Sequence, residues 1–276
     1  MSAPLFQRQM RDLERVESRV LAALRFIDAA TEAAISTPLQ LESLDGRANF
    51  IRNQRGMVVL DHWSGLSAHR DAFEAPPALP AVGSLTLRVA VTDPAGAYLP
   101  RIVSLALPRD PTLVDPDPAS SLFEAVRVPM YPTSAAATGA NWSLLRVSLA
   151  EDGSGDALGG ALLRVRRNGD VIARGMTDWR GEGLVAVVGV PVMTFGDDEE
   201  AVVVEAINVS LEVVFDPDSG SRLSADSLRD RRLPPPQVLV DPVAMEAAAA
   251  ELPHSARSLS IAARRTQSVA MTLQLP

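Results

Sequence analysis

Residues 162–190 restrict the fold of this chain more than any other part of the sequence. Three apolar, β-prone runs are separated by Asn168-Gly169 and by residues 177–181, which read Thr-Asp-Trp-Arg-Gly. Asn-Gly is the strongest short hairpin signal, because both central residues of a type I′ turn need a positive φ. At the second turn, Asp178 can cap the backbone with its side chain and Gly181 can supply a left-handed residue. The segment therefore predicts three strands joined by two turns.

The same order of elements occurs earlier in the chain, so the sequence predicts an internal repeat. Each copy has a lead strand, a loop and three further strands joined by two turns. Asp45-Gly46 is predicted as the hairpin turn of the first copy, and residues 53–56 as its second turn. The expected strands are 24–28, 38–41, 48–51 and 57–60 in the first copy, and 144–149, 161–165, 171–174 and 184–188 in the second.

Further β-prone runs follow each copy, and they complete the expected architecture. Short strands separated by Pro- and Gly-containing turns are typical of antiparallel sandwiches. We therefore expect an all-β protein with two tandem antiparallel β-sandwich domains. The additional strands are expected at 84–91, 98–107, 201–214, 258–262 and 268–275. We expect four parts in the chain: an N-terminal helical arm at 1–18, a first domain at 19–110, a Pro-rich linker at 111–140, and a second domain at 141–276. The second domain is expected to contain an insertion at 221–253, with a short helix at 242–251.

The composition of the chain restricts which partners it can bind and which kinds of metal or covalent site it can form. The net charge of −8 argues against nucleic acid as the main partner, because phosphate contact favours a basic face. There is no cysteine, which excludes disulfides and thiolate metal sites. No apolar run has the length of a signal peptide or of the ~18 residues that a membrane span needs. We expect a cytoplasmic protein that could also form part of a released particle.

Few residue patterns suggest catalysis or metal binding. His62 and His69, each near aspartates, are a weak metal candidate, because a seven-residue gap in an expected loop has no ligand geometry of its own. Asp152 and Asp156 alternate with Ser154 in a Gly-rich loop and could present oxygens to calcium, but plain turns are the favoured interpretation. No Gly-x-Ser-x-Gly elbow occurs. We expect no enzyme activity, no cofactor and no metal.

Three regions are candidates for contact with partner proteins. Phe6, Met10 and Leu13 recur at helical spacing in the N-terminal arm. Trp179 lies at a turn tip, and Trp63 and Trp142 lie near the edges of the two copies. Exposed aromatic side chains at such loops could bind a sugar or a protein, but lids over a small core are more common. The insertion carries a charged run that includes Arg229, Arg231 and Arg232. Arms and insertions of this kind commonly dock onto neighbouring subunits.

The second copy resembles the carboxypeptidase regulatory-like, or transthyretin-like, family of small β-sandwiches. The resemblance is carried by Gly-Ala-Leu at 160–162, by Asn168-Gly169, and by residues 177–181, which are similar to the family's T-D-x-x-G turn. The last strand, within 266–275, also fits. The corresponding turn of the first copy, residues 53–56, lacks the Thr-Asp pair. The resemblance implies tandem modules that are typically non-catalytic.

A second resemblance is to proteins encoded beside the sheath and tube genes of phage-tail-like contractile injection systems, in which similar paired sandwiches occur. It is carried by Arg52-Asn53 with Gly56, and by the segments 98–100, 107–110 and 129–132. This resemblance implies a role in a large particle.

Three functional hypotheses remain open from the sequence. The leading one is a non-catalytic structural protein that contacts the protein subunits of a larger assembly, as a monomer or a homo-oligomer. The second is a module that binds carbohydrate or a cell-surface ligand through loop aromatics. The third is a small transthyretin-like hydrolase, for which the second copy offers no matching histidine before His254.

Overall fold

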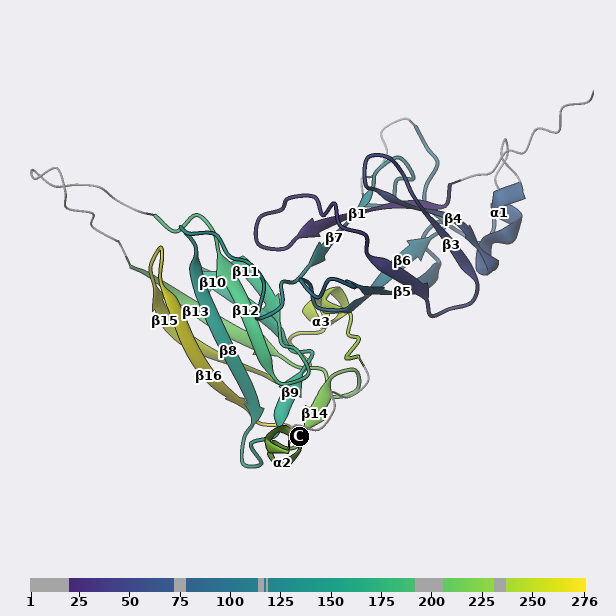
Figure 1. The fold of residues 1–276 in the computed structure, drawn as a ribbon. Coiled ribbons are helices and arrows are strands. Elements are labelled where there is room, and N and C mark those ends of the chain that lie inside the picture. The colour runs from purple at the N-terminus through teal and green to yellow at the C-terminus, as the bar shows by residue number, and fades with distance from the viewer. Residues whose placement is uncertain (1–19, 72–77, 114–116, 118, 192–205, 231–236) are drawn as a thin grey trace, which may run out of the picture.

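The computed structural model describes residues 20–71, 78–113, 117, 119–191, 206–230 and 237–276. The described chain is mainly β-strand with three short α-helices, which confirms the all-β class (Figure 1). The predicted N-terminal arm, residues 1–18, lies outside the described residues. No helix in the described ranges is long and apolar enough to cross a membrane.

Strands β1 to β7 form two sheets, which we call the N-terminal sheet pair. One has the order β3-β4-β1-β7 and the other β2-β5-β6. Phe26 and Leu60 of the first sheet and Leu87 and Leu105 of the second belong to one buried cluster, so the two sheets share a core. The strands are β1 (Ala22–Asp28), β2 (Gln40–Ser43), β3 (Ala48–Arg52), β4 (Val58–Trp63), β5 (Leu85–Thr92), β6 (Arg101–Leu107) and β7 (Val126–Met130), and the helix α1 (Ser67–Asp71) follows β4.

Strands β8 to β16 form the C-terminal sheet pair. One sheet has the order β12-β8-β9-β14 with β16 also paired to β8, and the other has the order β11-β10-β13-β15. Leu145 and Val185 of the first sheet share a buried cluster with Leu163 and Leu211 of the second. The strands are β8 (Ser143–Glu151), β9 (Ala157–Gly159), β10 (Leu162–Arg167), β11 (Asp170–Met176), β12 (Glu182–Val187), β13 (Ile207–Val214), β14 (Ser221–Leu223), β15 (His254–Ile261) and β16 (Thr266–Leu273). The helices are α2 (Ala225–Arg229) and α3 (Pro242–Ala247).

The repeat predicted from the sequence is present in the strand pairing. The lead strand β1 pairs antiparallel with β4 and parallel with β7, and the lead strand β8 pairs in the same two ways with β12 and β16. The opposite sheets also correspond, because β2-β5-β6 matches β10-β13-β15. Most strand pairs are antiparallel as expected, but β1–β7 and β8–β16 are parallel, which the sequence did not predict. In each copy the last strand returns from the opposite sheet and runs beside the lead strand in the same direction.

The two copies differ in where the chain crosses between sheets. Asp45-Gly46 is not a hairpin turn, because β2 pairs with β5 while β3 pairs with β4. Long-range contacts hold this corner: the Asp45 carboxylate accepts hydrogen bonds from the Arg88 backbone N (2.7 Å) and guanidinium Nη2 (2.7 Å). The Trp63 indole also donates to the Asp45 carbonyl (2.7 Å). In the second copy the hairpin comes first, between β10 and β11, and the crossing follows at residues 177–181.

Both turns of the second copy have the geometry expected from their residues. Asn168 and Gly169 have φ values of 52° and 92°, and they close the β10–β11 hairpin. At the crossing, Gly181 has a φ of 73°, and the Asp178 carboxylate accepts hydrogen bonds from the backbone N of Arg180 (2.8 Å) and Glu182 (3.1 Å). The buried Thr177 hydroxyl accepts from the Ala161 backbone N (2.9 Å) and donates to the Leu158 carbonyl (2.9 Å). The threonine and aspartate side chains therefore fix the crossing.

The segments predicted as linker and insertion contribute to the sheets. Residues 111–140 contain β7, which joins the N-terminal sheet pair beside β1. Pro129 lies in this strand, which is at the edge of its sheet, where a residue without an N–H is tolerated. The insertion at 221–253 supplies β14, which pairs with β9, and the helices α2 and α3. Helix α3 starts at Pro242 as expected and ends at Ala247, four residues before the expected end at 251.

Candidate functional site

Residues 237–252 of the insertion lie between the two sheet pairs, and Figure 1 shows α3 in that position. Val240 and Met245 share a buried cluster with Leu99 and Tyr131 of the N-terminal sheet pair and with Leu162 of the C-terminal pair. The Ile102 backbone N donates to the Val240 carbonyl (2.7 Å). We call these contacts around α3 the joint. They connect the two sheet pairs through apolar packing and backbone hydrogen bonding.

A buried arginine lies within the joint. The Arg101 side chain on β6 is 2% exposed, and its Nη1 donates to the Pro129 carbonyl of β7 (2.7 Å). Its Nη2 lies 3.7 Å from Oδ1 of Asp241, and its Cζ lies 5.8 Å from the centre of the Tyr131 ring. Burial lowers the pKa of Arg101. Asp241 also accepts from the backbone N of Val243 (3.0 Å), so it caps α3 while facing Arg101.

A second ion pair fixes the other face of α3. Glu246 accepts from Arg174 of β11 at 2.8 Å (Nη2 to Oε1) and 3.0 Å (Nε to Oε2). This two-point contact raises the pKa of Arg174, since the hydrogen bonds with Glu246 favour the charged guanidinium. Helix α3 is therefore bound by an arginine from each sheet pair.

A groove of about 310 Å³ lies beside the joint and contains the predicted contact residue Trp179. Tyr98, Leu99, Met176 and Val238 contribute to its lining. Trp179 is half-buried, and Cζ of Arg180 lies 5.6 Å from its ring centre. The groove is thus an apolar surface with aromatic side chains from both sheet pairs.

Several polar groups at this groove are engaged in local contacts. The Asp93 carboxylate accepts from the backbone N of Ala97 (2.8 Å), and the Thr133 hydroxyl donates to the Gly96 carbonyl (3.1 Å). The Tyr98 hydroxyl donates to Asp28 (3.1 Å), and burial together with that carboxylate raises the pKa of Tyr98 to about 12. A ligand would therefore bind here mainly through apolar and ring contacts.

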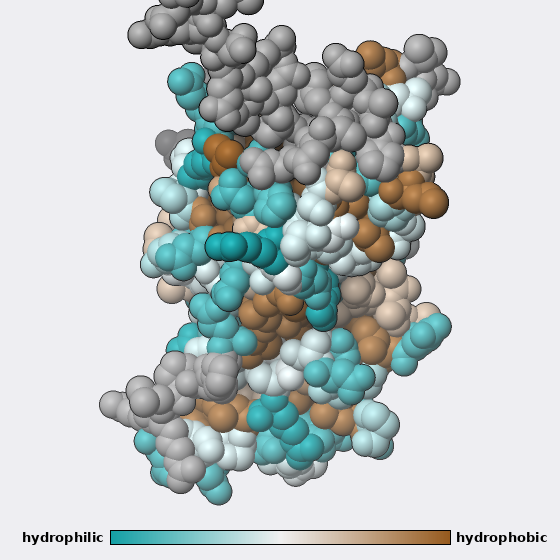
Figure 2. All heavy atoms as spheres, turned by 90° about the vertical axis from the view of Figure 1, so that its right-hand side faces the viewer, coloured by the Kyte–Doolittle hydropathy of each residue, from teal (hydrophilic) through white to brown (hydrophobic). Residues whose placement is uncertain are grey.

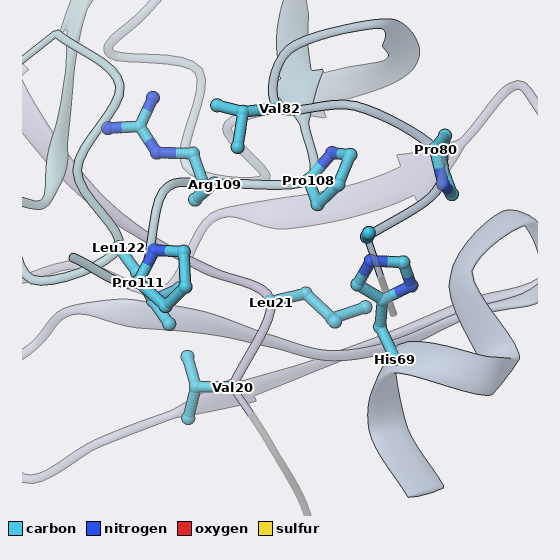
Figure 3. A pocket seen from close by; sticks show the side chains of 10 residues that line it. Val20, Leu21, His69, Pro80, Val82, Pro108, Arg109, Pro111 and Leu122 are labelled. Carbon is cyan, nitrogen blue, oxygen red and sulfur yellow. The ribbon is translucent and has the colours of Figure 1, made fainter. Parts of the chain in front are cut away.

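A pocket of about 230 Å³ opens at the far end of the N-terminal sheet pair (Figure 3). Its lining is largely apolar and comes from five separate segments: Val20 and Leu21, His69, residues 78–82, residues 108–111, and Leu122. Figure 3 shows the His69 ring reaching toward Leu21 and Pro80 from α1, whereas the Arg109 guanidinium points away. That guanidinium donates to the carbonyls of Ser121 (2.8 Å) and Ala119 (2.8 Å). We call this site the end pocket.

Large apolar side chains remain exposed on the segments that form the end pocket and on residues close to them in the sequence. Leu79 is 78% exposed, Leu113 75% and Phe123 58%, and Val20 and Val82 are also exposed. Figure 2 views the molecule from this side, and brown apolar side chains reach the surface there among polar ones. Of the ten large apolar side chains that are exposed among the described residues, three lie on these segments, and Leu113 and Phe123 lie within two residues of them. Concentrated apolar exposure of this kind is typical of interaction sites.

The histidines do not come together as metal ligands. His62 lies on β4 with a buried Nδ1 that has no hydrogen-bond partner, and His69 is buried on α1. Nδ1 of His254 lies 2.8 Å from the Leu252 carbonyl oxygen. Among the residues that the structure describes, no three His, Asp or Glu side chains are grouped as a metal site would require.

In the acidic loop that was considered for calcium, Asp156 and Ser154 make contacts with other side chains of the protein. Asp156 accepts from Nε of Arg222 (2.9 Å), and the same guanidinium also contacts Glu151. Ser154 donates its hydroxyl to Glu151 rather than facing an open site. The Asp156 carboxylate is therefore paired with the Arg222 guanidinium, and this arrangement is that of a plain turn.

The remaining candidate contact residues are either described by the structure or lie outside the described ranges. Trp63 is buried in the core of the N-terminal sheet pair, and Trp142 is partly buried against a small separate cluster that contains Leu144 and Leu184. Arg229 is exposed on α2 and pairs with Asp226 (3.1 Å). The others lie outside the described residues: Phe6, Met10, Leu13, Arg231 and Arg232.

Sequence reasoning missed the buried arginine and the end pocket. A signal for the first was present, because Arg101 is in phase with Val103, Leu105 and Leu107, the inward positions of an alternating strand. The end pocket had no local signal, since its segments are far apart in the sequence.

No family model and no curated protein matches this chain. Function must therefore be argued from the residues themselves.

Proposed function

We propose that this chain is a non-catalytic structural protein that acts through contacts with protein subunits of a larger particle. In this proposal, the N-terminal and C-terminal sheet pairs are two tandem β-sandwich domains of transthyretin-like or Ig-like type, preceded by the arm at 1–18. The favoured particle is a phage-tail-like contractile injection system, on the resemblance of the segments 98–100, 107–110 and 129–132. The protein would be made in the cytoplasm before it joins the particle.

The exposed apolar surface around the end pocket carries this proposal. Leu79, Leu113 and Phe123 leave most of their side-chain area in water. Covering each such side chain completely would contribute about 1.5–3 kcal/mol, so three of them could supply a large part of a specific contact. A neighbouring protein subunit is the simplest partner that covers several separated side chains at once.

The joint supports the same function in a second way. Arg101, Asp241 and Glu246 tie α3 to both sheet pairs, and an apolar cluster surrounds it. An interface with packed apolar residues and ion pairs restricts motion between domains. A subunit of a regular particle needs its contact surfaces at fixed separations, which the joint would provide.

Native affinity purification of the tagged chain from its own host tests the proposal. Sheath, tube or baseplate proteins are expected in the eluate by mass spectrometry, with tail-like particles visible by negative-stain microscopy. The double variant Leu79→Ser/Leu113→Ser is expected to lose these proteins, whereas Ile51→Ser, at a 49% exposed residue of β3, is expected to retain them. A monodisperse chain that elutes without particle proteins would contradict the proposal, and hydrolase activity in a broad screen would contradict its non-catalytic part.

The groove at Trp179 favours a second candidate function, binding of carbohydrate or a cell-surface polymer. Trp179 and Tyr98 offer ring faces, and Gln237 and Thr133 lie in the same lining. Glycan-array binding is expected under this alternative, and Trp179→Ala should abolish it. Phe123→Ala removes an exposed aromatic ring outside the groove and should leave binding unchanged. An array without signal would exclude this candidate for the glycans it displays.

A further inference from the structure

A pocket of about 370 Å³ lies on the outer face of the β11-β10-β13-β15 sheet, and two arginines and two glutamates line it. Arg164 and Arg166 of β10, Glu212 of β13 and His254 of β15 contribute to its lining. Glu246 of α3 also lines it. The pocket is separate from the groove at Trp179 and from the end pocket.

Two arginines in this pocket share one carboxylate oxygen. Nη2 of Arg164 lies 3.1 Å from Oε2 of Glu212, and Nε of Arg166 lies 2.7 Å from the same oxygen. The second carboxylate of the lining, Glu246, is already bound at two points by Arg174. When Arg174 is counted, three guanidinium groups meet two carboxylates here, which leaves about one positive charge without a counter-ion.

Arg164 also has an unmet hydrogen-bond donor. Its side chain is 10% exposed, and its Nε is buried without a hydrogen-bond partner. A buried charged donor that lacks a partner is unfavourable, because it has lost water and gained nothing in return. A small acceptor that enters the pocket could satisfy this group after a small shift of the guanidinium.

We propose that this pocket binds an oxyanion, either a phosphate or a carboxylate, through Arg164 and Arg166. Planar guanidinium groups bind both anions through paired N–H donors. In the described structure Glu212 occupies the position of a competing internal anion, so an incoming oxyanion shares or displaces its contacts. The proposal does not depend on the proposed role in a particle.

Arginine Nε–Hε resonances of the full chain provide a direct test. We expect a saturable shift of the Arg164 resonance when sodium phosphate is added, and no saturable shift when sodium chloride is added at the same ionic strength. A parallel titration with sodium acetate separates the two sources. A stronger response to phosphate points to a phosphorylated ligand, and an equal or stronger response to acetate points to a carboxylate of a protein side chain or chain end.

Three variants make the test specific. Arg166→Gln is expected to weaken phosphate binding about tenfold, because it removes a charged donor. Glu212→Gln is expected to strengthen binding by a similar factor, because it removes the competing carboxylate while keeping its shape. Arg146→Gln is the matched control: Arg146 lies exposed on β8, donates to the Ser134 carbonyl (2.9 Å) and should leave binding unchanged. A response that is identical in chloride, or that survives unchanged in Arg166→Gln, would overturn the proposal.

Discussion

Replacement of Arg101 by alanine is expected to lower the free energy of unfolding by about 3 kcal/mol. The side chain is 2% exposed, and it donates to the carbonyls of Pro129 (2.7 Å) and Ile102 (3.2 Å). Truncation leaves these acceptors with fewer donors, removes the cation from the Tyr131 ring, and opens a cavity at the joint. The loss is large because the Arg101 side chain itself is almost completely removed from water.

Urea denaturation of the full chain measures this effect, and two further variants separate its causes. Arg127→Ala is the control, because Arg127 is 59% exposed and pairs only with the 76% exposed Glu32 at 3.2 Å. Exposed ion pairs contribute little, so no measurable change is expected there. Arg101→Met keeps much of the volume without the buried charge, and it should recover a large part of the stability. Equal midpoints for Arg101→Ala and Arg127→Ala would show that the buried arginine does not support the joint.

Local sequence signals predicted both turns of the second copy and most strands correctly. The Asn168-Gly169 hairpin and the Thr177–Gly181 crossing depend on backbone preferences and on side chains a few residues away. Because such preferences do not depend on the rest of the fold, these turns can be predicted from the sequence alone. The order of elements in the two copies was predictable for the same reason.

Assignment of strands to sheets was not predictable from local signals. Asp45-Gly46 has the residues of a hairpin turn, but Arg88, which is 43 residues away, binds the Asp45 carboxylate and holds a corner there instead. The Pro-rich segment that holds β7 was interpreted as a linker because of its composition. Pro129 is tolerated there only because β7 is an edge strand, and edges are decided by the assembled sheet.

The candidate sites show the same division. Trp179 was predicted as a contact residue and does line a groove, because a turn tip is exposed in any arrangement of the sheets. His69 was considered for metal binding, but it is buried and contributes to the end pocket. That pocket depends on segments up to about a hundred residues apart, from Val20 to Leu122, so only the folded chain reveals it.

Replacement of Gly181 by alanine is expected to destabilise the C-terminal sheet pair by about 3 kcal/mol or more. Gly181 has a φ of 73°, a region in which a Cβ atom is unfavourable by about 1–2 kcal/mol. A Cβ here would also press against the carbonyl oxygen of Leu149 and lie 3.2 Å from the backbone N of Leu158. These are backbone atoms of β8 and β9, so the neighbours cannot move aside without disturbing the sheet.

The crossing makes this glycine necessary, because the chain passes closely over β8 as it changes sheets. The Leu149 backbone N donates to the Gly181 carbonyl (2.8 Å), and the Gly181 N donates to the Asp178 carbonyl (2.9 Å). A shift that relieves the Cβ contact would weaken both hydrogen bonds. Conformational preference, steric contact and hydrogen bonding therefore all act in the same direction at this position.

Gly169→Ala is the matched control for this prediction, measured by urea denaturation under the same conditions. Gly169 has a φ of 92°, but a Cβ added there meets nothing within 4 Å. Only the backbone preference is lost, so a decrease of about 1 kcal/mol is expected. If both variants lost the same free energy, the close passage of the crossing over β8 would contribute nothing to stability. A substantially larger loss for Gly181→Ala would show that the close passage over β8, and not positive φ alone, requires glycine at this crossing.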